Sequence, residues 1–210
     1  GRNFSNKIWN AFRLIKGWKT GNVKQPESSK IAILWFESKI NNSIREINLL
    51  FSKYRISEAL MIIYKLIWEE FCSWFLEIVK PKYNTPIDNI TYNSTIQNLE
   101  KILKLLHPFS PFITEEIWHK IKVRKDDIII AKWPKEENIN NTILEEFENT
   151  TKIIAEIRTI KKEQNIQNKH QLNLEVIKSK KQLNYLNSII KKLENLNKIS
   201  IVSNKPKNAF

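Results

Sequence analysis

The chain has 210 residues, of which 41% are hydrophobic and 10% aromatic, enough apolar material for one large domain or for a domain with a small satellite. Only 3 glycines are present, so neither a tight-turned all-β fold nor a glycine-rich phosphate loop fits this sequence. The single cysteine excludes an internal disulfide and a cysteine-based zinc site, and the three histidines are not at metal-ligand spacing. We therefore expect no metal.

The formal net charge of +13 attracts polyanions, and phosphate backbones are the usual target of such a surplus. A soluble basic protein from a proteome rich in lysine and asparagine is the plain alternative. The sequence has no run of about 18 apolar residues that could span a bilayer. Its first residues also lack the apolar stretch of a signal peptide. We expect a cytoplasmic protein.

Apolar residues recur at three-to-four spacing through the first 125 residues, which is typical of amphipathic helices. The expected helices cover residues 2–18, 27–53, 57–80, 94–106 and 111–122. Gly17 ends the first helix, and Pro81 ends the third. Three serines are the expected N-caps: Ser57, Ser94 and Ser110. Five helices with short connections predict an antiparallel bundle over residues 1–125.

The pattern changes after residue 125. A short run of apolar residues at 128–131 predicts a strand. Apolar and polar residues alternate at 172–176, which also predicts a strand, and residues 199–202 are a further strand candidate. Helices are expected at 142–165 and 180–195. The fold class is therefore mainly α, an antiparallel helical bundle followed by a small α/β C-terminal subdomain at 126–210.

Residues that could perform covalent or acid–base catalysis are hard to find in this sequence. Cys72 lies among aromatic residues of a helix, where a packed thiol is expected rather than a nucleophile. His107 precedes a proline at a helix end and is expected to act as a cap, while His119 has no evident partner. Glu115 and Glu116 resemble a pair of catalytic carboxylates, but adjacent residues of a helix point about 100° apart. We expect both to be surface charges. We expect no catalytic residue.

Basic residues recur beside amides and aromatics at two places in the first half of the chain. They lie on the first helix and its exit and again after the third helix: Arg13, Lys16, Trp18, Lys19, Lys80, Lys82 and Tyr83. Residues 151–198 add eleven Lys or Arg against four Asp or Glu. Unpaired RNA is bound by aromatic stacking and by cations on its backbone. Solvated helix faces remain the alternative.

Five segments resemble, in order, the anticodon-binding region of valyl-tRNA synthetases, which are class I aminoacyl-tRNA synthetases. They are GRNFSNKIWNAFRLIKG at 1–17, RISEALMIIYKLIWEEFCSWFLEIVKPK at 55–82, LLHPFSPFITEEIW at 105–118, IIIAKWPK at 128–135 and IIAEIRTIKKEQNIQ at 153–167. The third segment is shared with the leucyl and isoleucyl enzymes, but its residues HPF-x-PFITEEIW favour the valyl member. The resemblance covers practically the whole chain.

The departures from the family pattern are few. Position 5 is Ser where the family often has Cys, and Lys161 stands where a second arginine is common after Arg158. The catalytic HIGH and KMSKS signatures and the C-terminal coiled-coil arm are missing. The resemblance therefore implies an excised region, the anticodon-binding domain and the segment that follows it, without the catalytic domain.

The resemblance implies that the parent protein is a valine–tRNA ligase that charges tRNA with valine using ATP and magnesium. For this region it implies no cofactor, no activity of its own, and tRNA and the parent's catalytic domain as partners. Neither a membrane nor DNA is expected, and the chain is expected to be monomeric. The alternatives are a leucyl or isoleucyl relative, or a free-standing basic helical interaction module with no RNA role.

The polar face of the first helix is the main candidate for contact with the anticodon stem-loop. The complete set of expected RNA-binding residues is Asn6, Asn10, Phe12, Arg13, Lys16, Lys80, Lys82 and Arg158. For the aromatic residues of the first helix, Phe12 and Trp9, packing in the core is the alternative to contact with a base.

Overall fold

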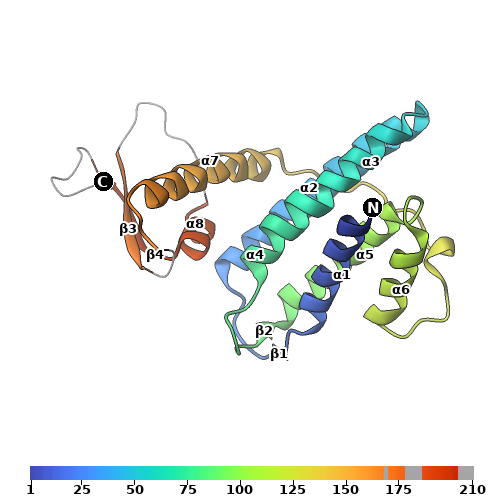
Figure 1. Cartoon of the computed structure of the whole chain (residues 1–210), viewed down its shortest axis with the longest axis horizontal. Coiled ribbons are helices and arrows are strands. Elements are labelled where there is room, and N and C mark those ends of the chain that lie inside the picture. The colour runs from blue at the N-terminus through green and yellow to red at the C-terminus, as the bar shows by residue number, and fades with distance from the viewer. Residues whose placement is uncertain (168–169, 178–185, 203–210) are drawn as a thin grey trace. The chain divides into compact units, whose positions relative to one another are not determined.

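The computed structural model describes residues 1–167, 170–177 and 186–202, and the chain forms two compact units, Gly1–Ile139 and Asn140–Phe210 (Figure 1). The helical elements of the first unit, in chain order, are α1 (Arg2–Lys16), α2 (Glu27–Ser52), α3 (Ile56–Lys65), η1 (Leu66–Phe75), α4 (Leu76–Val79), α5 (Asn89–Leu106), α6 (Pro111–Ile121) and η2 (Ile128–Ile130). Two short strands, β1 (Thr20–Gly21) and β2 (Ile87–Asp88), pair with each other.

The helices of the first unit form an antiparallel bundle, in which successive long helices run in opposite directions (Figure 1). Helix α2 packs against α3, η1 and α5, and α6 packs against α5 (Figure 1). Helix α1 packs against η1, α5 and α6. The mainly helical fold that the sequence predicted is confirmed.

Aromatic rings dominate the core between α2 and η1. Phe36 of α2 stacks on Phe75 with ring centroids 4.6 Å apart and contacts Phe71 at 5.4 Å. All three side chains are fully buried. Aromatic pairs of this geometry contribute beyond the burial of their area, so this cluster holds the two long helices together.

The expected helix at 57–80 is one continuous helical run made of three parts. Helices α3 and α4 flank η1, a π-helical segment of 10 residues in which backbone hydrogen bonds span five residues. The run ends at Val79, and Pro81 follows it closely, as the sequence predicted.

Two of the three expected helix caps are wrong. The fourth helix begins at Asn89 rather than Ser94, because the buried carboxylate of Asp88 accepts the backbone N–H of Thr91 at 2.8 Å. Helix α3 begins at Ile56, so Ser57, the residue expected to cap it, lies within its first turn. Ser110 does occupy the N-cap position of α6, with proline next to it, but its side chain makes no capping hydrogen bond.

Residues 128–131 form no strand in the structure, which corrects the sequence prediction. Ile128–Ile130 is the 3₁₀ turn η2, and only Ile128 is buried, while the next two isoleucines are 73% and 69% exposed. The carboxylate of Glu115 accepts the backbone N–H of Ile128 at 2.9 Å. A side chain therefore satisfies the donor that a neighbouring strand would have bound.

The first compact unit ends at Ile139 and the second begins at Asn140, so the change of hydropathy pattern at residue 125 falls within the first unit. Residues beyond 125 remain tied to the bundle by side-chain hydrogen bonds. The indole N–H of Trp118 binds the carbonyl of Asp126 at 3.2 Å, and that of Trp133 binds Asn48 at 2.9 Å. The hydropathy pattern does not record such contacts. It therefore changes at residue 125 although the first compact unit continues to Ile139.

The second unit contains α7 (Asn141–Glu163), β3 (Leu172–Ile177), α8 (Asn187–Glu194) and β4 (Leu196–Val202). The strands β3 and β4 are parallel, which requires a crossover connection, and α8 lies in that connection. The side chain of Asn140 caps α7 by accepting the N–H of Ile143 at 3.2 Å. The expected helix at 180–195 is seen as α8, and residues 180–185 of that prediction lie outside the described residues.

None of the helices in the described ranges combines the length and apolar character that crossing a membrane requires.

Candidate nucleic-acid interface

Helix α1 has a buried apolar side and an exposed polar side, as its residue spacing predicted. The buried residues are Ile8, Ala11, Phe12 and Ile15. The polar residues Arg2, Asn6, Asn10, Arg13 and Lys16 are all exposed. They recur every three or four positions, so they lie along one side of the helix. The structure thus brings four of the expected RNA-binding residues together on one exposed face.

Phe12 is the exception among the expected residues of α1. Its side chain is only 5% exposed, and its ring lies 5.7 Å from that of the half-buried Trp9. The core-packing alternative is the one that the structure shows, and the ring of Phe12 offers no open face to a base. The reason is geometric: Phe12 follows Ile8 by four positions and so falls on the buried side.

The two cations at the C-terminal end of α1 differ in their surroundings. The ammonium of Lys16 donates a hydrogen bond to the carbonyl of Ile121 at 3.1 Å, at the end of α6. Arg13 is exposed, and its side chain makes neither a hydrogen bond nor an ion pair with any residue in the described ranges. Of the two cations at this end of the helix, Arg13 is therefore the one better placed to bind an external anion.

An aromatic ladder supports α1 against the long helix. Phe4 stacks on Tyr64 at 5.2 Å, Tyr64 stacks on Trp68 at 5.7 Å, and the ammonium of Lys7 lies 5.1 Å from the ring of Trp68. A cation over an indole face is attracted by the ring quadrupole. These contacts fix the rotation of α1 about its axis, and so they keep its polar face toward solvent.

Lys80 and Lys82 lie in the loop that follows α4, and both are exposed. Lys80 forms an ion pair with Glu77 one turn earlier, whereas Lys82 accepts hydrogen bonds from Thr85 only through its backbone carbonyl. The parallel bridge between β1 and β2 holds this loop against the exit of α1. Each strand of this bridge has only two residues, which is too short for a hydropathy pattern. The sequence analysis therefore did not predict it.

Arg158 lies on α7 of the second unit, where its guanidinium pairs with the carboxylate of Glu194 at 2.8 Å. The same carboxylate binds the ammonium of Lys161 at 2.9 Å, and Lys161 is buried. The lysine that replaces the family's second arginine is therefore bound within the fold, because its ammonium also donates to the backbone carbonyl of Glu194 at 2.7 Å. The side chain of Arg158 remains 55% exposed.

His119 has partners in the structure, contrary to the sequence analysis. Its Nε2 lies 3.1 Å from Glu115 and 3.0 Å from Asp127, and these three residues are the group within the described ranges that could hold a metal ion. Glu115 also binds the backbone of η2. The cluster therefore joins α6 to the segment after it. The adjacent Glu116 pairs instead with Lys120, so the two glutamates point apart as predicted.

Cys72 is buried in η1, and its burial raises the pKa of the thiol from an ordinary 9.0 to about 11, while Lys7 lowers it slightly.

Since the thiolate is the nucleophile, the folded chain should react with iodoacetamide at pH 8 roughly 100-fold more slowly than the urea-unfolded chain. Because the unfolded thiol loses its proton first, the free energy of unfolding should also fall as pH rises from 9 to 11. Equal alkylation rates in the two states would contradict this burial.

The fold and this surface define a class of protein. The family described as the anticodon-binding domain of tRNA ligases matches residues 34–178, and the chain belongs to that family. Within it, the chain is similar to valine–tRNA ligases. It is 46% identical to the enzyme of Christiangramia forsetii over 97% of the chain, 48% identical to that of Porphyromonas gingivalis over 83%, and 31% identical to that of Thermotoga maritima over 98%.

The resemblance that the five sequence motifs indicated is thereby confirmed. The aligned regions are 24%, 20% and 24% of these three relatives, so the chain spans about a quarter of their length or less.

Proposed function

We propose that this chain recognises the anticodon stem-loop of valine tRNA as part of a cytoplasmic valine–tRNA ligase. The exposed polar face of α1 carries this proposal, because it presents amide and guanidinium donors on a rigid helix in a chain of the anticodon-binding family. Amides and guanidinium groups bind both base edges and phosphates. The net charge of +13 adds a general attraction for the RNA backbone.

In this proposal the chemistry belongs to the parent ligase, which uses ATP and magnesium, and this region contributes binding. It positions the tRNA so that the acceptor end reaches the parent's catalytic domain, which is its second partner. Positioning of this kind lowers the entropic cost of the reaction without placing any group at the reacting atoms. The region acts as a monomer and binds no cofactor itself.

Arg13→Ala should weaken the binding of a valine tRNA transcript by about tenfold or more, because one charge-assisted hydrogen bond is lost. The matched control is Arg45→Ala, which removes the same charge from an exposed position on α2. Filter binding or fluorescence anisotropy with the 210-residue chain measures both. Equal losses in the two variants would show that only net charge matters and would overturn the role of the α1 face.

Salt and anticodon dependence test the proposal as a whole. A surface that neutralises phosphates loses affinity by nearly one power of salt concentration for each contact. We therefore expect a steep salt slope, and weaker binding of a transcript whose anticodon has been exchanged. A flat salt slope would favour a protein-interaction module instead, and equal binding of both transcripts would remove anticodon recognition.

A further inference from the structure

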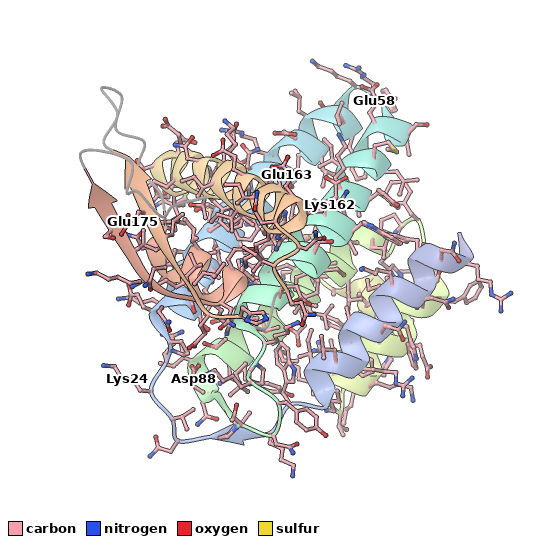
Figure 2. All side chains as sticks on the ribbon, turned by 60° about the vertical axis from the view of Figure 1, so that its left-hand side comes forward. Lys24, Glu58, Asp88, Lys162, Glu163 and Glu175 are labelled. Carbon is pink, nitrogen blue, oxygen red and sulfur yellow. The ribbon has the colours of Figure 1, made fainter. Side chains whose placement is uncertain are left out.

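Two basic loops meet at one end of the helical bundle. The loop at 17–26 follows α1 and the loop at 80–86 follows α4, and together they contain four lysines and no acidic residue: Lys19, Lys24, Lys80 and Lys82. The bridge between β1 and β2 joins them, with Thr20 opposite Ile87 and the N–H of Ile87 bound to the carbonyl of Lys19 at 2.9 Å. We call residues 17–26 and 80–86 the paired loops. Figure 2 labels Lys24 and Asp88 at this end of the unit.

The geometry of the paired loops is fixed by close packing. A Cβ added to Gly21 would lie only 2.9 Å from Cβ of Pro86, so no larger residue fits here unless the loops move apart. Gln25 donates to the hydroxyl of Thr91 at 3.2 Å, and Asp88 caps α5 through the N–H of the same threonine. The loops are therefore anchored to the first turn of α5 as well as to each other.

Tyr83 stands out within the paired loops because its side chain is 92% exposed. It makes no ring contact or side-chain hydrogen bond with any described residue. The next residue, Asn84, has φ of 57°, a left-handed conformation that asparagine tolerates well in tight turns. An uncovered aromatic ring next to a lysine is a combination that binds unpaired nucleotides, because every base has a face that can stack and every nucleotide has a phosphate.

We propose that Tyr83 is a base-stacking residue, and that the paired loops bind unpaired nucleotides of the tRNA at the end of the bundle where α1 stops. The inference rests on the proposed function and extends it from one helix face to a second element. The two surfaces are continuous in the chain, since α1 ends at Lys16 and the first paired loop begins at the next residue. Lys19, Lys24 and Lys82 neutralise phosphates while Tyr83 stacks on one base, and Lys80 keeps its ion pair with Glu77.

The opposite end of the bundle provides a matched control. Tyr54, in the turn between α2 and α3, is 89% exposed and is flanked by Lys53 and Arg55. Arg55, however, is occupied by an ion pair with Glu58. This turn lies far from β1 and β2 along the helices (Figure 1), and Figure 2 labels Glu58 there. Removal of Tyr54 therefore deletes an equally exposed ring at a place where the proposal expects no RNA.

The experiment compares Tyr83→Ala, Tyr83→Phe and Tyr54→Ala in the 210-residue chain. The probe is a valine tRNA transcript with 2-aminopurine at single unpaired positions of the anticodon loop, whose fluorescence is quenched by stacking. Tyr83→Ala should lower affinity about 5-fold or more, since one base–aromatic stack is lost. At one probe position it should also change the fluorescence of the bound RNA. Tyr83→Phe and Tyr54→Ala should both retain wild-type affinity.

Each outcome bears on a different part of the proposal. If Arg13→Ala weakens binding but Tyr83→Ala does not, the stacking role is wrong and the proposed function stands. A loss in Tyr83→Phe equal to that in Tyr83→Ala would assign the effect to the hydroxyl and overturn stacking. Absence of binding by the wild-type chain would overturn both proposals together.

Gly21→Ala tests the pairing of the loops without touching a cation or a ring. The added methyl group forces the two loops apart, so tRNA affinity should fall while the helical circular dichroism is unchanged. Full affinity in a Gly21→Ala chain would show that the loops need not be held together and would contradict the two-loop surface.

Discussion

Glu194→Ala is expected to destabilise the second unit by about 3–5 kcal/mol, because it leaves the ammonium of Lys161 buried without a counter-charge. Lys161 binds both the carboxylate of Glu194 at 2.9 Å and its backbone carbonyl at 2.7 Å. The two side chains are 5% and 2% exposed, so water does not replace the lost partner. Hydrogen exchange in α7 and α8, followed together with urea unfolding, measures the effect.

The control for this prediction removes both charges. A chain with Lys161→Met and Glu194→Leu should recover most of the lost stability, because apolar groups of similar size carry no desolvation penalty in the same place. Arg158 would remain in that variant with its side chain largely hydrated. If the double variant is as unstable as Glu194→Ala, the buried charge is not the cause of the destabilisation.

Phe75→Ala should destabilise the first unit by about 3–5 kcal/mol, the range for deleting a fully buried phenyl ring. Phe75 stacks on Phe36 and on Phe71, so one substitution removes two aromatic pairs and opens a cavity between α2 and the opposite helix. Urea denaturation monitored by tryptophan fluorescence gives the change in midpoint.

Phe112→Ala is the matched control, since it deletes the same ring from a position that is 90% exposed. Its effect should stay within about 0.5 kcal/mol, as for most surface substitutions. Similar losses in the two variants would mean that the ring at position 75 is not in the core of the folded chain.

The helical part of the fold was predictable because its signal is local. Apolar residues three or four positions apart define a buried face regardless of what covers it, so α1 and α2 were placed within two residues of their observed ends. The same periodicity identified the exposed polar face of α1. Phe12 was ambiguous because a large aromatic on a helix serves both as core and as a stacking surface.

The errors have one physical origin: side chains bind backbone groups in ways that the hydropathy pattern does not record. Asp88 caps α5 in place of Ser94, and Glu115 satisfies the backbone of η2 in place of a neighbouring strand. The burial of Lys161 was likewise not predictable, because the carboxylate that binds it lies 33 residues away in the chain.

The amino-acid sequence by itself determined the helical class, the polar face of α1 and the family, because helix periodicity and motif strings are properties of short segments. Only the tertiary structure decided which of the candidate cations are committed to partners within the fold and which face solvent. It also brought the two basic loops together, through a bridge and a close approach at Gly21. Pairings between distant residues depend on how the helices pack, and no short segment encodes them.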